Sequence, residues 1–352
     1  MKHKYDLVYL TNTPAFYKLN LCNEIAKKCS LLLVMYGYGK EAVNIKITND
    51  DQWNFDYEFI NNGNANRRNK VKTFINLLKL MNSINTHKII FGGWFSPEYN
   101  LYSFFSPKQK NVVACESTIF ECCLHGWKGW LKKCIINRMS ASLPSGKPHA
   151  EIFKSIDFKG EIHITGGVGL FYKPVHKSKE IHKPLRYVFV GRLIDVKNIE
   201  LLIDVFNKNK KPLTIVGDGY LREKLEYSAY GNIKFMGFLD NSNLGEKIYQ
   251  LADVLILPSI SETWGLVVEE SIYWGLPVIV SDHVGCSIDI VRDLNTGVVF
   301  ESKSAIGLQQ AIEKIETNFY YYKKNVDAVD FAQRDYEQVK VYVDLCKSNQ
   351  QY

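Results

Sequence analysis

One segment of the second half of the sequence limits the possible folds more than any other. Residues 252–259 (ADVLILPS) form a short apolar run that is too brief for a helix, and Pro258 ends it, which predicts a buried strand. Helical spacing follows up to Gly275, a residue typical of a helix C-cap, and residues 278–280 predict a second buried strand. This order of elements is typical of a βαβ unit, which requires a parallel sheet covered on both faces.

The same alternation occurs on both sides of a break rich in glycine and lysine at residues 166–184. Before it, strand-length runs at 7–10 and 112–115 alternate with helical spacing such as that of 70–84. At 352 residues the chain favours two domains, because single cores stop growing near about 250–300 residues. We therefore predict an α/β protein with two Rossmann-like domains, residues 1–170 and 185–329, followed by a helical tail over about 330–352. A ligand site is expected in a cleft between the domains, at the carboxyl ends of the strands.

Composition excludes few functions. The formal net charge of +7 suits phosphate-bearing ligands or an anionic membrane surface, but many proteins without either role are equally basic. The eight cysteines include no C-x-x-C pair, so neither a zinc site nor a disulfide framework is indicated, and a reducing cytoplasm is expected. No apolar run approaches the length of about 18 residues that a membrane-spanning helix needs. No strand precedes a G-x-G-x-x-G motif, which argues against a dinucleotide oxidoreductase.

Glycine-containing loops follow three predicted strands of the second half, at Gly191, Gly217 and Gly237. Glycine lets the backbone approach a ligand closely, and a helix N-terminus after such a loop favours an anion. Arg192 and Lys197 lie five residues apart around the first of these turns and could both reach a diphosphate. The alternative is a solvated basic turn.

Two glutamates frame the start of the helix predicted between the two central strands. Glu262 precedes that helix and Glu270 lies within it, with seven residues between them. Carboxylates around a helix N-terminus at a strand end indicate a binding site. The alternatives are that Glu262 complements the helix dipole and that Glu270 is an exposed helix residue.

Residues 186–300 resemble the donor-binding half of the family-4 retaining glycosyltransferases (glycosyl transferases group 1), which have the GT-B fold. The first half resembles the family mainly in layout. The resemblance implies two Rossmann-like domains facing each other across a cleft, with a C-terminal helix that returns to the N-terminal domain. The stretches that match are 191–193 (GRL), 197–198 (KN), 216–219 (VGDG), 233–237 (IKFMG), 252–259, 262–270, 275–279 (GLPVI), 289–291 (DIV) and 296–297 (TG).

The resemblance also assigns roles to individual residues. It implies that Arg192 and Lys197 neutralise the donor diphosphate as a leaving group, that Glu262 hydrogen-bonds the transferred sugar, and that Glu270 binds the ribose. The other donor-binding residues that it implies, several of them through their backbone, are Gly191, Gly217, Phe235, Gly237, Phe238, Thr263, Trp264, Gly265 and Leu266.

The first-strand loop departs from the family pattern. Many members have a glycine-rich loop there, whereas residues 11–17 (TNTPAFY) contain no glycine. Asn12 and Tyr17 are predicted to shape the acceptor site instead. An ordinary helix start that contains Pro14 is the alternative.

The strand at 112–115 is followed by a second departure. Many members have a histidine after this strand, facing the donor sugar, and this chain has Glu116. We predict that Glu116 is catalytic, because an acidic group could stabilise positive charge that develops at the anomeric carbon. The alternative is that Ser117 or Thr118 caps a helix while Glu116 is simply exposed.

The predicted activity is therefore the retaining transfer of a hexose-type sugar from a nucleotide-diphosphate sugar, with UDP as the expected nucleotide. The expected acceptor is a hydroxyl of a glycan or lipid-linked molecule in surface polysaccharide (O-antigen or capsule) biosynthesis. No metal, other cofactor or nucleic acid is expected, and the sequence has no Asp-x-Asp metal signature. The alternatives are a GT-B enzyme of other chemistry, such as an epimerase or a phosphorylase, and a non-catalytic glycan-binding protein.

Residues 126–133 (GWKGWLKK) mix tryptophans with lysines. Such a segment could lie at the headgroup boundary of an anionic inner membrane and give the protein a peripheral position on its cytoplasmic face. The alternative is a surface helix that packs Trp130 and Ile135 inward.

Overall fold

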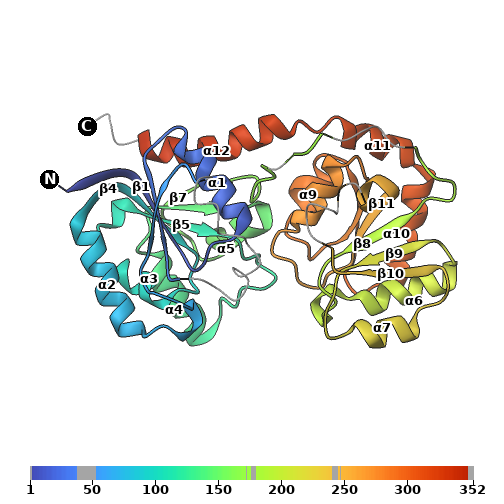
Figure 1. Ribbon diagram of the computed structural model, residues 1–352, viewed down its shortest axis with the longest axis horizontal. Helices are drawn as coiled ribbons and strands as arrows, with labels where there is room; N and C mark the ends of the chain where they lie inside the picture. The colour runs from blue at the N-terminus through green and yellow to red at the C-terminus, as the bar shows by residue number, and fades with distance from the viewer. Residues whose placement is uncertain are drawn as a thin grey trace. The chain divides into compact units, whose positions relative to one another are not determined.

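The computed structural model describes residues 2–37, 53–171, 173–175, 180–239, 245 and 247–347. The chain folds into two compact units. The first comprises Met1–Phe171 and Ala332–Tyr352, and the second Tyr172–Phe331 (Figure 1). Residues 172 and 176–179 of the predicted linker, and residues 348–352 of the predicted tail, lie outside the described residues.

The first unit is built on a seven-stranded sheet in the order β3-β2-β1-β4-β5-β6-β7, in which every strand pair is parallel. The strands are β1 (His3–Thr11), β2 (Leu31–Met35), β3 (Asp56–Phe59), β4 (Ile84–Gly92), β5 (Asn111–Cys115), β6 (Ala141–Pro144) and β7 (Glu161–Ile162). The helices are α1 (Phe16–Ala26), α2 (Lys70–Ser83), α3 (Pro97–Tyr102), α4 (Gly126–Ile136), α5 (Lys147–Ser155) and the short 3-10 helices η3 (Ala65–Arg67) and η4 (Lys108–Lys110).

Helices cover both faces of this sheet, as its continuous apolar strands require. Side chains of β1 alternate between two core clusters, with Leu7 and Tyr9 on one face and Val8 and Leu10 on the other. The first cluster is completed by α1, and the second by α2, α4 and α5. The predicted helix at 70–84 is α2, which ends at Ser83 because Ile84 already begins β4.

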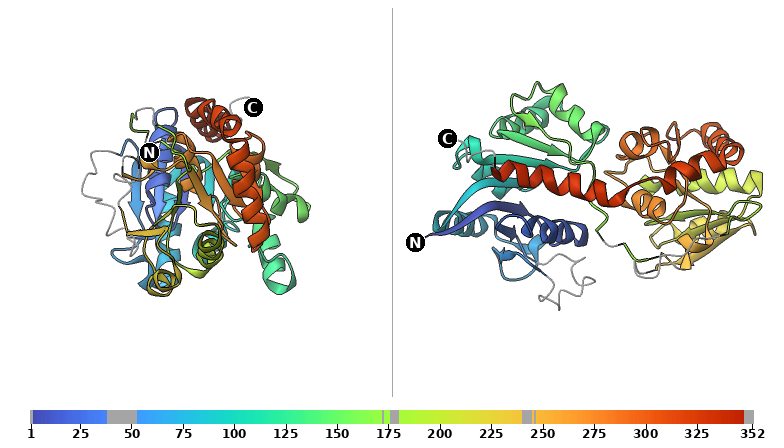
Figure 2. Two further views of the ribbon diagram at one scale, coloured as in Figure 1. Left: turned by 90° about the vertical axis from the view of Figure 1, so that its right-hand side faces the viewer. Right: turned by 90° about the horizontal axis from the view of Figure 1, so that it is seen from above.

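The C-terminal helix α12 (Phe331–Lys347) packs on the first unit, as predicted. Its buried residues Tyr342, Leu345 and Cys346 join the core cluster on the α1 face, and Figure 2 shows the helix beside that unit. The Gln338 side-chain amide donates a hydrogen bond to the carbonyl oxygen of Gly167 at 2.9 Å. The chain therefore returns to the first domain after completing the second.

The second unit has a six-stranded sheet in the order β10-β9-β8-β11-β12-β13, again parallel throughout. In each unit the strand order reverses beside the first strand, β1 or β8, which is the Rossmann-like arrangement, and the prediction of two such domains is confirmed. The strands are β8 (Tyr187–Val190), β9 (Leu213–Val216), β10 (Ile233–Gly237), β11 (Val254–Leu257), β12 (Val278–Ser281) and β13 (Gly297–Phe300). The helices are η5 (Asp195–Lys197), α6 (Ile199–Asn209), α7 (Arg222–Ser228), η6 (Tyr249–Leu251), α9 (Leu266–Tyr273), the π-helical turn η7 (Ser287–Arg292), α10 (Ala305–Thr317) and α11 (Phe319–Asp327).

The loops after β8 and β9 lie against each other at the carboxyl edge of this sheet. Gly217 has a φ of +134°, and a Cβ atom built there would overlap the carbonyl oxygen of Gly191. The backbone N–H of Gly217 donates to the carbonyl oxygen of Gly237 at 2.8 Å, which joins the loop after β9 to the end of β10. Glycine at 217 is therefore required for the packing of these loops, whatever ligand they meet.

We predict that Gly217→Ala destabilises the protein by at least about 1 kcal/mol, because alanine meets both an unfavourable φ and a backbone oxygen. The midpoint of urea unfolding measures this change. Gly231→Ala is the control, since a Cβ there meets nothing within 4 Å. Equal midpoints for the two variants would contradict the packing role of Gly217.

Candidate functional site

Lys197 and Glu262 meet at the carboxyl edge of the second sheet. Lys197 lies in η5, which follows β8, and Glu262 lies in the loop between β11 and α9. Because β8 and β11 are parallel neighbours, their following loops start side by side. The Lys197 ammonium forms an ion pair with the Glu262 carboxylate, and both side chains are largely withdrawn from solvent. The strand order reverses between these two strands, where ligands of open α/β sheets bind.

Backbone hydrogen bonds to the segment after β12 fix the Glu262 loop. The Glu262 N–H donates to the carbonyl oxygen of His283 at 3.3 Å, and the Gly285 N–H donates back to the carbonyl oxygen of Glu262 at 2.9 Å. The buried indole of Trp264 donates to Glu269 at 2.6 Å. The Trp264 side chain thus anchors the loop in the core, and only its backbone can serve a ligand.

The N-terminus of α9 lies next to Glu262. Gly265 is its N-cap residue, with a φ of +94° that favours glycine, and Thr263 is exposed. The first N–H groups of a helix have no intrahelical acceptor, and they carry the positive end of the helix dipole. The backbone from Thr263 to Leu266 can therefore bind an anion beside Lys197.

Glu270 lies one turn along α9 in a different environment from that of Glu262. Burial raises the pKa of its carboxyl to about 7, although the Tyr249 hydroxyl, which donates to it at 3.3 Å, acts in the opposite direction. The neighbouring Glu269 adds to the increase in pKa. A carboxyl that titrates near neutrality gains charge readily when a ligand supplies two hydroxyl donors, as the ribose of a nucleotide does.

The other predicted donor residues lie along the same edge of the sheet. Gly191 and the exposed Arg192 follow β8, and Gly217 follows β9. Phe235 and Gly237 belong to β10, and the exposed Phe238 comes directly after it. The structure therefore brings all the predicted donor residues to the carboxyl ends of four adjacent strands and the N-terminus of α9.

The predicted residues of the first unit gather at the corresponding edge of its own sheet. Glu116 follows β5, and Tyr17 lies at the start of α1, which follows β1. The Tyr17 hydroxyl donates to Glu116 Oε2 at 3.0 Å, and the Lys18 ammonium lies 3.1 Å from Oε1. Glu116 is thus neither fully exposed nor without partners.

The capping alternative for the segment after β5 is wrong. The next helix, α4, begins only at Gly126, with His125 at its N-cap, and Thr118 is fully buried. Neither Ser117 nor Thr118 starts a helix.

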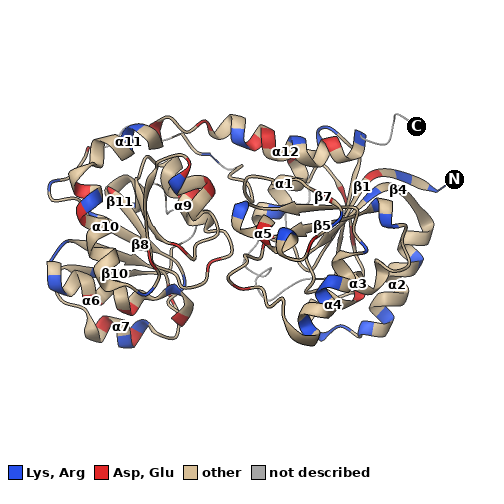
Figure 3. Ribbon diagram, turned by 180° about the vertical axis from the view of Figure 1, so that it is seen from behind, with Lys and Arg blue, Asp and Glu red and all other residues tan. Residues whose placement is uncertain are grey.

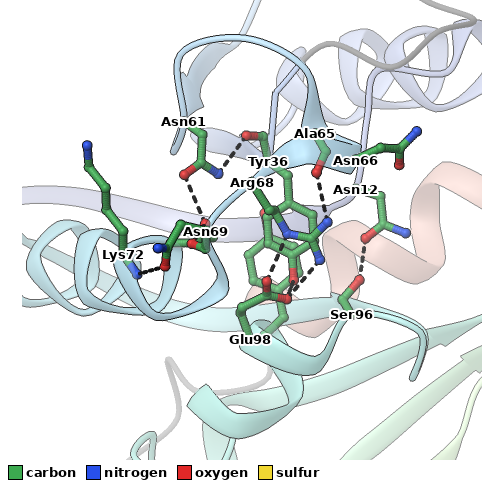
Figure 4. Close-up of polar contacts among 12 residues, drawn as sticks. Asn12, Tyr36, Asn61, Ala65, Asn66, Arg68, Asn69, Lys72, Ser96 and Glu98 are labelled. Carbon is green, nitrogen blue, oxygen red and sulfur yellow. Dashed lines mark hydrogen bonds and ion pairs between the residues drawn. The ribbon is translucent and has the colours of Figure 1, made fainter.

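Asn12 lies beside a polar cluster that sequence reasoning missed (Figure 4). Its side-chain oxygen accepts a hydrogen bond from the hydroxyl of Ser96, which connects the loops after β1 and β4. Next to them, Arg68 makes two hydrogen bonds to the buried Glu98, at 2.8 and 2.9 Å, and stacks on the ring of Tyr36 at 3.9 Å. Burial would raise the pKa of Glu98, but the bonds from Arg68 and Tyr36 outweigh it and lower that pKa. Arg68 and Glu98 satisfy each other, so the cluster fixes the loops around Asn12.

Comparisons with known proteins agree with this arrangement. Residues 173–334 match the family model described as "Glycosyl transferases group 1". The second unit is a group 1 glycosyltransferase domain. An uncharacterized glycosyltransferase of Methanocaldococcus jannaschii is 31% identical over 137 residues, which are 36% of this chain and 35% of that protein.

A second relative is the GalNAc-alpha-(1->4)-GalNAc-alpha-(1->3)-diNAcBac-PP-undecaprenol alpha-1,4-N-acetyl-D-galactosaminyltransferase of Campylobacter jejuni. It is 28% identical over 185 residues, which are 48% of this chain and 51% of that protein. The chain thus spans between about a third and a half of the length of these two relatives.

The solved structure of HepE from Anabaena in complex with UDP has a TM-score of 0.70 to this protein. The match covers 99% of each chain at 15% identity. At that identity the likeness speaks for the fold alone, and the fold is GT-B. The family model covers the second unit, and the structural likeness extends over the first unit as well.

The raised pKa of Glu270 leads to a prediction on nucleotide binding. If ribose hydroxyls bind the ionised carboxyl, UDP binding lowers its pKa below about 7, so affinity is full above pH 7 and falls as the pH drops below it. We expect about tenfold weaker binding at pH 6 than at pH 8, measured by calorimetry.

Glu270→Gln serves as the matched variant, since its amide does not titrate. It should bind UDP more weakly, and the only pH dependence left should come from the titration of the UDP phosphates. The same pH dependence in both proteins would remove Glu270 from the ribose site.

Proposed function

We propose that this protein is a retaining glycosyltransferase. It moves a hexose-type sugar from a nucleotide-diphosphate sugar to a hydroxyl of a glycan or lipid-linked acceptor. The observation that carries the proposal is the Lys197–Glu262 ion pair beside the N-terminus of α9, within the group 1 domain. A nucleotide-diphosphate sugar offers a negatively charged diphosphate and sugar hydroxyls. A cation, a helix N-terminus and a carboxylate at one edge of a sheet suit these groups.

The donor would replace the internal ion pair with interactions of its own. Its diphosphate attracts Lys197 and the exposed Arg192, which leaves Glu262 to accept hydrogen bonds from sugar hydroxyls. The two cations and the N–H groups of α9 then stabilise the negative charge that grows on the leaving diphosphate. Glu270, one turn along, would hold the ribose. In this arrangement the two glutamates orient the donor rather than transfer protons.

UDP is the nucleotide we propose, and surface polysaccharide assembly the context. Support comes from the UDP bound in the HepE structure and from the polyprenyl diphosphate acceptor in the name of the Campylobacter relative. A panel of UDP- and GDP-sugars decides the nucleotide, because only a true donor is turned over in the assay below.

We predict that Lys197→Ala and Glu262→Ala each lower kcat on the donor by on the order of 100-fold, the usual cost of losing one group that stabilises charge in a transition state. The measurement is release of the nucleoside diphosphate, with and without a glycan acceptor. Lys211→Ala is the matched control, since Lys211 also pairs with a glutamate, Glu316 at 2.7 Å, but precedes β9 at the opposite edge of the sheet.

Turnover by the control should equal that of the unchanged protein. If both Lys197→Ala and Glu262→Ala kept full turnover, the proposed donor site would be abandoned. If the unchanged protein turned over none of the sugars, the proposed activity would be abandoned.

We also propose peripheral contact with an anionic membrane, through a surface of the first unit that we call the basic aromatic face. It consists of α2, residues 101–110 and α4, which together contain no acidic residue. Phe74 of α2 contacts Phe105 with ring centroids 5.6 Å apart, and Arg138, just after α4, hydrogen-bonds the carbonyl oxygen of Ser103 at 3.2 Å. These segments therefore form one surface, and Figure 3 shows Lys and Arg on α2 and α4.

Large apolar side chains on this face are exposed rather than packed. Trp127 and Trp130 of α4 are 71% and 67% exposed, whereas Ile135 of the same helix is buried. The alternative interpretation, a surface helix that packs both Trp130 and Ile135 inward, is therefore wrong for Trp130. Exposed tryptophans among lysines suit a lipid headgroup region. None of the described helices combines the length and hydropathy needed to cross a bilayer.

We predict that the protein co-sediments with vesicles of anionic lipid at low salt and less at high salt, and not with neutral vesicles, because salt screens the attraction of surface charges. Replacing both Trp127 and Trp130 by serine should abolish most of the binding. Tyr227→Ser is the control, because Tyr227 is an even more exposed aromatic residue of the second unit, and this variant should bind unchanged. Absence of the unchanged protein from the pellet at both salt concentrations would end this proposal.

A further inference from the structure

We propose that Lys18 is a positioning residue, which together with Tyr17 holds Glu116 as a fixed carboxylate for the transfer reaction. Lys18 belongs to the first unit and lies outside residues 173–334, which match the group 1 family model. The inference rests on the proposed glycosyl transfer and on the prediction that Glu116 is catalytic.

Each oxygen of the Glu116 carboxylate has a donor of its own. The Lys18 ammonium lies 3.1 Å from Oε1, and the Tyr17 hydroxyl donates to Oε2 at 3.0 Å. Both donors come from consecutive residues in the first turn of α1, whose apolar face is packed into the core through Leu19, Leu21 and Cys22. The carboxylate is therefore oriented by a rigid element rather than by flexible surface side chains.

Burial of the two partners is unequal, and this points to a supporting role for the lysine. The Lys18 side chain is 11% exposed, and that of Glu116 is 35% exposed. The Lys18 ammonium also lies 5.5 Å from the ring centroid of Tyr9 and 3.5 Å from the hydroxyl of Thr11. The cation thus lies inside, behind a carboxylate that still reaches solvent and can meet a ligand.

An ordinary ion pair at the C-terminal end of α1 has the opposite character. Lys27 and Glu24 pair at 2.6 Å, but their side chains are 54% and 34% exposed, so the cation is the more solvated partner. Such a surface pair contributes little to stability. Burying a lysine is costly unless a charge partner is held close, so a buried Lys18 implies a fixed Glu116.

The charges around Glu116 determine which form of the carboxyl is present. Burial would raise the pKa of Glu116, but the Lys18 ammonium, the hydrogen bonds from Lys18 and Tyr17, and His149 of α5 together lower it below its usual value. Among the described residues, Tyr9 of β1, Cys115 of β5 and Tyr342 of α12 also interact with Glu116, and burial raises the pKa of each. Glu116 therefore stays ionised at neutral pH, where it accepts hydrogen bonds and favours a nearby positive charge. A general acid would need the opposite shift.

The test is the pH dependence of donor turnover by the full chain. In Lys18→Met the carboxyl loses its cation, so the acid limb of kcat at saturating donor should move up by about 1–3 pH units and kcat should fall, with little change in KM for the donor. The limb is read from kcat because kcat/KM also contains the titration of Glu270 in the free protein. Lys18→Arg keeps the charge and should restore the acid limb in part. Lys27→Met, at the C-cap of the same helix, is the control and should leave the profile unchanged.

An unmoved acid limb in a folded Lys18→Met protein would overturn the inference. If that variant fails to fold, Tyr17→Phe takes its place, because it removes one hydrogen bond to Glu116 and should move the limb in the same direction by less. An unmoved limb there would overturn it equally.

A second measurement separates this inference from the proposed activity. The ¹³C chemical shift of the Glu116 carboxyl, assigned by comparison with Glu116→Gln, reports its titration without any turnover. A titration midpoint that rises in Lys18→Met supports the positioning role, and one that does not rise overturns it, even if every donor sugar fails as a substrate.

Discussion

The ion pair between Lys197 and Glu262 depends on one constraint, the parallel pairing of β8 with β11. Parallel strands deliver all their carboxyl ends to one edge of a sheet, so loops that are far apart in the sequence start beside each other. The strand order reverses between these two strands, which leaves room there for a ligand. Gly217 lets the loop after β9 close against the loop after β8. The backbone hydrogen bonds between Glu262 and the segment after β12 hold the Glu262 backbone in place.

Both units place a lysine and a glutamate at this kind of edge, but the two pairs differ in kind. In the second unit both partners are similarly withdrawn from solvent, and under the proposed function the donor diphosphate would compete with Glu262 for Lys197. In the first unit Lys18 lies well inside and Glu116 faces outward, so a ligand meets the carboxylate without displacing its cation. Under the proposed function, a ligand would break the Lys197–Glu262 ion pair, whereas the Lys18–Glu116 ion pair would stay intact.

The sequence predicted two Rossmann-like domains and the residues at the carboxyl edge of the second sheet, because those residues belong to short local patterns. The glycine loops, the basic turn and Glu262 all lie in segments that directly follow a strand, and Glu270 lies in the next helix. The partners of Glu116 could not be predicted in this way, since Tyr17 is 99 residues away in sequence and Lys18 has no pattern of its own. The same holds for Arg68 and Glu98, which are 30 residues apart. Capping by Ser117 or Thr118 failed as an interpretation because an irregular segment, and not a helix, follows β5.

Three carboxyl groups of the same chemistry thus acquire different properties from their surroundings. Glu262 and Glu116 each have a lysine within contact, while among the contacts described for Glu270 only the Tyr249 hydroxyl donates to it and an acidic neighbour opposes its charge. The pKa of Glu270 is accordingly raised to about 7, whereas that of Glu116 is lowered. A group whose charge is incomplete near neutral pH gains most from a ligand that donates hydrogen bonds, and a group already ionised supplies a constant field. Under the proposed function, nucleotide binding and the chemical step should therefore respond to acid in different pH ranges, because Glu270, proposed to bind the ribose, becomes protonated at a higher pH than Glu116, predicted to be catalytic.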